Sequence, residues 1–464
     1  MSPKTESMST ADAVWLHMED PTNLMFVVGV LRFDGPLDAA ALKTTLAARL
    51  LRFHRFRQRL KKSRRPLRHL QWEDDPHFDI NAHIHSVALP SPADDAALQK
   101  LIGDFASTPL DMSKPLWQMH LVEGVNREGC AVVVRIHHAI ADGLALIYVL
   151  LSVLDEQPDA IWVDAETTGA DGSLLDTLLR PATAVLHTTR KLTDTAVSQS
   201  RDLLTHPGKV IDMAKTAGDL AFASARLLRL GPDADTVLRG KLGVAKRVAW
   251  SEPIPLSVVK LVGKSSGATV NDVLLTTFTG TLRRYLASRG EPVDNLEIRV
   301  MVPVALRPLA ESANLGNHFG NVILSLPIRV ADPWERLQLL KERMTALKQS
   351  PEATLMLTSM SLIGYAPGDL ASRLIELFSK SCSAIMTNVP GPQHPLYLTG
   401  VELQNVMVWG PLSGRLGVSS SILSYNGRVT LGIISDANLV PDPEALVAAF
   451  SQEFSALQDR IANL

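Results

Sequence analysis

An apolar run that ends in two adjacent histidines constrains this chain more than any other stretch. Residues 131–136 (AVVVRI) have the β-branched composition of a buried strand, and His137 and His138 follow them directly. A second apolar run, 144–154, begins two residues after Asp142 and is long enough for a helix. We therefore expect a strand, a short polar turn and a helix in immediate succession, which is a unit of α/β folds.

Strand-like and helix-like segments alternate on both sides of this unit, beginning with a capped helix-like segment at 8–20 in which Trp15 is expected to pack. The chain has 464 residues, too many for one ordinary hydrophobic core. We predict an α/β fold with two lobes of similar size, residues 1–156 and 246–464. For residues 157–245 we predict a helical connector, whose helices could pack on the lobes or lie on a membrane.

Composition narrows the class of protein. The formal net charge is -2, so global charge does not suggest a nucleic-acid partner. The two cysteines, Cys130 and Cys382, are too few for a disulfide framework and fit a reducing compartment. The start of the sequence lacks the apolar core of a signal peptide, and no run of about 18 apolar residues predicts a membrane span. We expect a cytoplasmic protein, with peripheral membrane association left open.

The sharpest charge asymmetry lies at residues 52–68, where nine of seventeen residues are Lys or Arg. One interpretation is contact with anionic lipid headgroups or with the phosphates of a carrier such as coenzyme A. The other is a solvated hairpin with Phe53 and Phe56 turned inward. Further on, His83 and His85 would share one face of a strand. A metal site there is disfavoured because local spacing supplies no third ligand.

The two histidines at the end of the strand should face different surroundings, because successive strand residues point to opposite faces. One can then face a site while the other stays structural. Histidine is well suited to take a proton near neutral pH, although a pair of turn histidines bonded to the backbone is an equally simple interpretation. Gly143 is expected to permit a tight turn into the helix. No P-loop and no G-x-G-x-x-G motif is present, so the nucleotide-binding classes that use them are not indicated.

Residues 137–143 (HHAIADG) resemble the HHxxxDG motif of the coenzyme A-dependent acyltransferase superfamily. Nearly end to end, the chain resembles the bacterial wax ester synthase/diacylglycerol acyltransferase family. The matching segments are PLW (115–117), TVNDVL (269–274), VPVALRP (302–308), GNHFGN (316–321) and TNVPGP (387–392). The spacing of His137 and Asp142 also fits the H-x4-D motif of glycerolipid acyltransferases, but the membrane segments and second motifs of those proteins are absent. The D-F-G-W-G motif of plant alcohol acyltransferases is absent as well.

This resemblance implies two chloramphenicol-acetyltransferase-like lobes, with mixed sheets flanked by helices and a tunnel between the lobes. It implies His138 as the general base, direct attack without an acyl-enzyme, and acyl-CoA as co-substrate with no cofactor or metal. Asn271 is the candidate for oxyanion stabilisation or alcohol positioning, with an ordinary helix N-cap as its alternative. Asp142 is expected to hold the turn and to pair with Arg307. The expected catalytic residues are His137, His138, Asp142 and Asn271, and the expected substrate-binding residues are Pro115, Leu116, Trp117, Gly143, Asp272 and Arg307.

Three functions follow from these patterns. The first is a long-chain acyl-CoA:alcohol O-acyltransferase that makes triacylglycerol from diacylglycerol, wax esters from fatty alcohols, or both, at a membrane or lipid-droplet surface. The second keeps the fold but acylates another acceptor or uses a carrier-bound acyl donor. The third, from another class, is a non-catalytic lipid-binding or droplet-associated protein, which the intact histidine motif disfavours.

Overall fold

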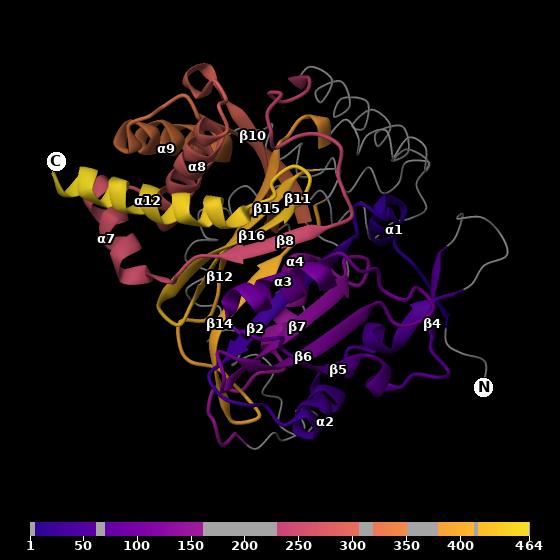
Figure 1. The fold of residues 1–464 in the computed structure, drawn as a ribbon. Helices are drawn as coiled ribbons and strands as arrows, with labels where there is room; N and C mark the ends of the chain where they lie inside the picture. Colours follow the sequence, from indigo (N-terminus) through magenta and orange to yellow (C-terminus); the bar gives the residue numbers. More distant parts are fainter. Residues whose placement is uncertain are drawn as a thin grey trace.

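The computed structural model describes residues 5–61, 70–160, 230–305, 319–349, 379–412 and 416–463. Two sheets form two lobes, which Figure 1 shows one above the other. The first lobe is built on a six-stranded sheet with the order β13-β14-β2-β7-β6-β5. Its strands are β13 (Tyr397–Leu398), β14 (Val401–Trp409), β2 (Phe26–Phe33), β7 (Gly129–His137), β6 (Trp117–Val125) and β5 (Ile84–Ala88). The pairing of β5 with β6 is parallel and the others are antiparallel, so the sheet is mixed.

The second lobe is a larger mixed sheet with the order β11-β10-β12-β15-β16-β8, with β9 paired to β16. Helices α8, α9 and α12 pack together on this lobe (Figure 1). The strands are β8 (Lys246–Trp250), β9 (Ile254–Pro255), β10 (Ile298–Ala305), β11 (Phe319–Leu326), β12 (Ala384–Pro390), β15 (Val418–Tyr425) and β16 (Arg428–Asp436). The helices are α7 (Leu256–Ser266), α8 (Val270–Ser288), α9 (Pro333–Gln349) and α12 (Pro443–Ala462), with the short η4 (Val293–Asn295).

The first lobe carries its own helices and a small additional sheet of order β1-β4-β3. Its α-helices are α1 (Thr10–Met18), α2 (Ala39–Arg49), α3 (Asp95–Ala106) and α4 (Gly143–Leu151), and its short helices are η1 (His54–Arg57) and η2 (Ile80–Ala82). The small sheet consists of β1 (Thr5–Ser7), β3 (Gln58–Leu60) and β4 (Gln71–Asp74). The predicted α/β fold with two lobes is confirmed, as is the strand–turn–helix succession at β7 and α4.

The C-terminal half of the chain contributes two strands, β13 and β14, to the first sheet. β14 comes from the C-terminal half of the chain, yet it pairs antiparallel with β2 in the first sheet, with Trp409 opposite Val28. Figure 1 shows this orange strand among the indigo and purple strands of the first lobe. The prediction that residues 246–464 form one lobe did not include this pairing. Strand pairing is non-local, and an alternating pattern does not identify the partner strand. The pairing of β14 with β2 joins the two halves of the chain through backbone hydrogen bonds.

Local sequence signals explain several element boundaries. The β15–β16 hairpin turns at Asn426 and Gly427, which both have positive φ (46° and 72°). A two-residue turn of this type requires positive φ at both positions, which an Asn-Gly pair adopts readily. Ser9 begins α1 by accepting a hydrogen bond from the N–H of Asp12 at 3.0 Å.

The described part of the basic segment contains η1 and β3, and β3 pairs antiparallel with β4. Phe56 is fully buried, and Phe53 packs against the same core. Several of the cations have partners: the Arg55 guanidinium lies over the Trp72 ring and Arg59 pairs with Glu73 at 2.9 Å. Residues 62–68 of this segment lie outside the described residues, as does most of the predicted connector, 161–229.

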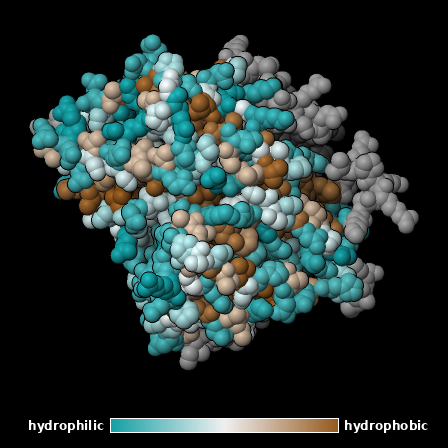
Figure 2. All heavy atoms as spheres, viewed as in Figure 1, coloured by the Kyte–Doolittle hydropathy of each residue, from teal (hydrophilic) through white to brown (hydrophobic). Residues whose placement is uncertain are grey.

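The surface carries no long apolar strip on the face shown in Figure 2, where hydrophobic residues appear in small groups among hydrophilic ones. Among the residues that the structure describes, the exposed large hydrophobic side chains are separate in the sequence, at Met112, Leu230, Val244 and Leu261. Among the described helices, none combines the length and the apolar composition needed to cross a bilayer.

A buried histidine in the first sheet makes stability depend on pH. His120 on β6 is 7% exposed and stacks on Phe105 at 4.0 Å. Burial, followed by the charges of Arg135 and His85, lowers the pKa of His120 from 6.5 to about 4. Between about pH 6.5 and pH 4 the unfolded chain therefore binds a proton that the folded chain rejects, so stability falls as pH falls through this window, by up to about 3 kcal/mol.

We expect His120→Phe to flatten this pH dependence, because phenylalanine keeps the ring stack and removes the titrating group. Urea unfolding of both proteins at pH 7.5 and pH 5 measures the difference. An unchanged loss of stability between these pH values in the variant would show that other groups are responsible.

Candidate active site

His137 is the last residue of β7 and is completely buried. Its Nε2 lies 2.7 Å from Oε2 of Glu19, its Nδ1 accepts the N–H of Ala139 at 3.0 Å, and its own N–H donates to the carbonyl of Leu116 at 2.9 Å. Because Nδ1 accepts a hydrogen bond, the proton of the neutral ring belongs on Nε2, from which it donates to the carboxylate. Both ring nitrogens are thus occupied by protein groups.

His138 follows immediately and has different surroundings. Its N–H donates to the carbonyl of Met25 at 2.8 Å, which continues the pairing of β7 with β2 by one residue. Its ring stacks on Trp15, with centroids 3.8 Å apart and planes inclined by 16°. The side chain is 7% exposed. The prediction that the two histidines have different surroundings is confirmed.

Asp142 connects the turn to the following helix. It is the N-cap of α4, where its Oδ1 accepts the N–H of Ala145 at 2.9 Å and its carbonyl accepts the N–H of Leu146. The expected role in holding the turn is therefore seen directly. Gly143 is the first residue of α4, and its φ is not positive. The turn therefore does not require the conformational freedom of glycine at this position. An added Cβ at this position would meet nothing within 4 Å. Arg307 lies outside the described residues.

Residues Pro115, Leu116 and Trp117 are buried and support the histidine turn from the side of β6. The carbonyl of Leu116 accepts the N–H of His137, as described above. The indole Nε1 of Trp117 donates to the carbonyl of Phe56 at 2.8 Å, and its ring stacks on that of His83. These contacts connect the histidine turn to η1 in the basic segment. That these residues also shape a tunnel stays a prediction.

The second lobe contributes the start of α8. Thr269 is the N-cap and forms a capping box with Asp272: Asp272 accepts the N–H of Thr269 at 2.9 Å, and the Thr269 hydroxyl accepts the N–H of Asp272 at 3.2 Å. The alternative that Asn271 is the N-cap is therefore wrong. Instead, its Oδ1 accepts a hydrogen bond from Nδ2 of Asn388, at the end of β12, at 2.9 Å. Asp272 lies in the first turn of α8, directly after Asn271, and has a capping role there.

Three residues of this arrangement were not predicted as parts of the site: Trp15, Glu19 and Asn388. Trp15 was expected only to pack, and Glu19 lies 118 residues before the histidine it contacts. Asn388 belongs to the segment 387–392, whose resemblance to the family was a signal for it, but nothing local linked it to Asn271.

The described residues do not group three His, Cys, Asp or Glu side chains around a point that could hold a metal ion. The expected sharing of one strand face by His83 and His85 is wrong, because β5 begins after His83. Nδ1 of His83 lies 2.8 Å from the carbonyl oxygen of Trp117, whereas His85 lies beside His120. Burial lowers the pKa of His83, which fits a neutral ring in the core.

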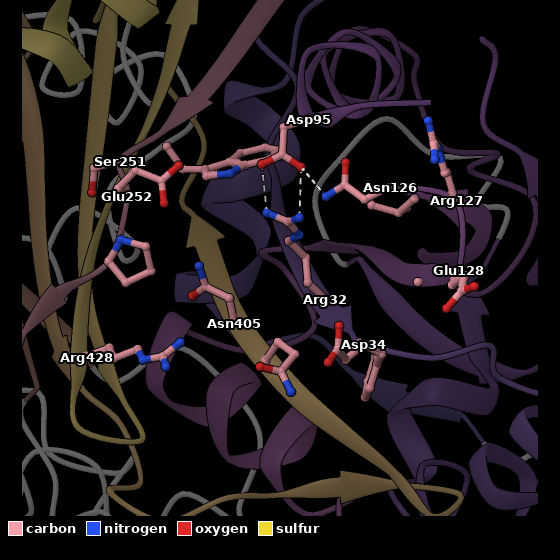
Figure 3. A pocket seen from close by; sticks show the side chains of 16 residues that line it. Arg32, Asp34, Asp95, Asn126, Arg127, Glu128, Ser251, Glu252, Asn405 and Arg428 are labelled. Atoms are coloured by element: carbon pink, nitrogen blue, oxygen red, sulfur yellow. Dashed lines mark hydrogen bonds and ion pairs between the residues drawn. The ribbon is translucent and has the colours of Figure 1, made fainter. Parts of the chain in front are cut away.

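A cavity of about 480 Å³ lies near the other end of β7, where Gly129 begins the strand. Figure 3 shows the bidentate pair of Arg32 with Asp95, at 2.9 and 2.8 Å, and Asn126 donating to the same carboxylate on its wall. Side chains from both halves of the chain line it, among them Arg428. None of the expected site residues does, so this cavity is not the predicted tunnel.

Comparison with known proteins agrees with the geometry. Residues 8–274 match the model of the wax ester synthase/diacylglycerol acyltransferase catalytic domain, and residues 315–458 match the C-terminal domain of the same family. A probable diacylglycerol O-acyltransferase of Mycobacterium tuberculosis, tgs1, is 28% identical, over 98% of this chain and 95% of the relative. A putative diacylglycerol O-acyltransferase of Mycobacterium bovis is 29% identical, over 97% and 90%.

Two solved structures show the same fold. The wax ester synthase/diacylglycerol acyltransferase from Marinobacter aquaeolei VT8 superposes with a TM-score of 0.70 at 21% identity, over 98% of this chain and 100% of that one. The first condensation domain of the calcium-dependent antibiotic synthetase superposes with a TM-score of 0.61 at 15% identity, over 100% and 97%. The two family models and the curated relatives identify the protein as an acyltransferase. The chain belongs to the wax ester synthase/diacylglycerol acyltransferase family.

Proposed function

We propose that the protein transfers a long-chain acyl group from acyl-CoA to the hydroxyl of diacylglycerol, of a long-chain fatty alcohol, or of both, with His138 as the general base. The observation that carries this proposal is the contrast between the two histidines. Both ring nitrogens of His137 are bonded to protein groups, and the ring of His138 instead stacks on Trp15 while its backbone N–H donates to Met25. His138 is also the second histidine of the HHxxxDG motif, and histidine is well suited to take a proton near neutral pH.

The proposed reaction is a direct displacement. His138 takes the proton of the acceptor hydroxyl as the oxygen attacks the thioester carbonyl, and a tetrahedral intermediate forms. When the C–S bond breaks, the coenzyme A sulfur takes the proton from the imidazolium, and the ester leaves. General-base catalysis contributes roughly 10²–10⁴-fold to such a step, and the alignment of two substrates contributes much of the rest.

Asn271 is the proposed donor to the oxyanion. Its carbonyl oxygen accepts from Asn388, and within the described residues nothing accepts a hydrogen bond from its Nδ2. An amide held in this way is preorganised to donate. We expect Asn271→Ala to lower kcat about 10-fold to 100-fold, and Asn388→Ala to lower it less, because Asn388 only orients the donor. Steady-state kinetics on both variants test these effects. Equal kcat for Asn271→Ala and the wild type would contradict the proposed role of Asn271 as donor to the oxyanion.

Thiol release from palmitoyl-CoA, with diacylglycerol and hexadecanol offered in parallel, tests the function itself. Release that depends on either acceptor supports the proposal and gives the acceptor preference. Release only when the acyl group is presented on a carrier protein would favour the condensation-type alternative. Lipid binding without thiol release would favour a non-catalytic lipid-binding protein.

The same proposal places the enzyme at a membrane or lipid-droplet surface, because both acceptors partition into lipid. Arg52, two residues before η1, and Arg57, the last residue of η1, are exposed cations that could contact anionic headgroups. Sedimentation with vesicles containing anionic lipid measures this association. Recovery of the protein only in the supernatant would contradict it.

A further inference from the structure

Helix α1 contacts both histidines of the turn, although it precedes them by more than a hundred residues in the sequence. Trp15 lies within the helix, and Glu19 is its C-cap residue. The two are four positions apart, so they lie on the same side of the helix axis. One short element therefore reaches the proposed base and its neighbour at the same time.

Glu19 acts through a single oxygen. Its Oε2 accepts the Nε2–H of His137 at 2.7 Å and the N–H of Met25 at 3.1 Å. The carbonyl of Met25 in turn accepts the N–H of His138 at 2.8 Å. The carboxylate thus fixes the His137 ring and also the backbone segment to which His138 is bonded.

Trp15 acts on the ring of His138. The two rings are stacked nearly parallel with their centroids 3.8 Å apart, and Trp15 and His138 are 6% and 7% exposed. Stacking at this distance restricts rotation of the imidazole about its bond to Cβ, because any large rotation would drive the ring edge into the indole. The plane in which the ring nitrogens lie is therefore set by Trp15.

We propose that α1 is a positioning element for acyl transfer, in which Trp15 sets the ring plane of His138 and Glu19 holds His137 and the backbone behind His138. The proposal rests on His138 as the base. Neither residue needs to touch substrate in this role. Their loss therefore lowers kcat and leaves KM nearly unchanged, because the bound substrates keep their contacts while the base loses its alignment.

Three variants test the role of Trp15. We expect Trp15→Leu to lower kcat about 10-fold and Trp15→Phe to restore most of it, since phenylalanine keeps a stacking face. Leu16→Ala is the matched control on the same helix: it removes apolar packing, lowers the melting temperature and leaves kcat near wild type. An equal loss of kcat in Leu16→Ala would show that Trp15 acts only through stability and would overturn the proposal.

Two variants test Glu19. Glutamine supplies one carbonyl oxygen that can accept both hydrogen bonds, so we expect Glu19→Gln to keep kcat within about 3-fold of wild type and Glu19→Ala to lower it about 10-fold. Equal losses in the two variants would mean that the negative charge, rather than positioning, is what matters, and would contradict the proposal.

A double-mutant cycle separates this proposal from the proposed function. If Trp15 acts through His138, Trp15→Leu has no further effect on kcat in a His138→Ala background, whereas additive losses would overturn the positioning role. Near-normal turnover of His138→Ala alone would instead overturn the base assignment, whatever the result with Trp15.

Discussion

Replacing His138 with alanine is expected to lower turnover at least about 10²-fold while the protein stays folded, because the variant loses the group that takes the hydroxyl proton. The backbone hydrogen bond from residue 138 to Met25 does not involve the side chain and is retained. The pairing of His137 with Glu19 is also untouched, so the end of β7 keeps its register. Thiol release from palmitoyl-CoA measures turnover, and far-ultraviolet circular dichroism with thermal melting measures folding.

His85→Ala is a suitable control for this variant, since His85 lies on β5 of the same sheet, is partly exposed and belongs to no proposed role. It should keep near-normal turnover. If His138→Ala also kept near-normal turnover with a normal melting temperature, the proton would have to go elsewhere and the mechanism would fail.

The parts of the fold that depend on local sequence were predictable. The apolar run at 131–136 and the following helix correspond to β7 and α4, and the Asn426-Gly427 pair, a strong hairpin signal, forms the turn between β15 and β16. What the sequence could not provide was the partner of β14, because its pairing with β2 joins segments several hundred residues apart. Hydrophobic alternation identifies a strand, but it carries no information about which sheet the strand enters.

The site was predictable to the same extent. Strand periodicity separated the environments of the two histidines, and the resemblance to a family directed attention to Asn271. A purely local signal was nonetheless missed: Thr269 and Asp272 have the spacing of a capping box, which excludes Asn271 as the N-cap. By contrast, no local pattern could place Glu19 against His137, because that contact depends on how α1 packs on the end of the first sheet.

The second lobe is held by a buried ion pair whose loss should be costly. Arg336 on α9 donates to Oε2 of Glu453 on α12 at 2.6 Å, and the two side chains are 1% and 6% exposed. Arg336 also donates to the carbonyls of Val330 and Ala331. Burial lowers the pKa of Arg336, and Glu453 opposes this effect. Gly280 of α8 leaves the space for the pair, since an added Cβ would lie 1.9 Å from both charged groups.

We expect Glu453→Ala to lower the free energy of unfolding by about 3–5 kcal/mol, because it leaves the guanidinium of Arg336 buried without its carboxylate. Arg460→Ala is the matched control on the same helix. Its pair with Asp332, at 3.2 Å, joins the same helix to the start of α9 but is 42% and 34% exposed, so its loss should cost less than about 1 kcal/mol. Urea unfolding of the two variants and of the wild type measures both losses of stability.

Gly280→Ala provides an independent check on the same pair, because its methyl group forces the two charged side chains apart without removing either. A loss of stability comparable to that of Glu453→Ala would show that the pair itself, rather than some other contact of Glu453, holds α8, α9 and α12 together. If Glu453→Ala and Arg460→Ala cost the same small amount, Arg336 must recover its hydrogen bonds from water or backbone, and the second lobe must be stabilised by its apolar core alone.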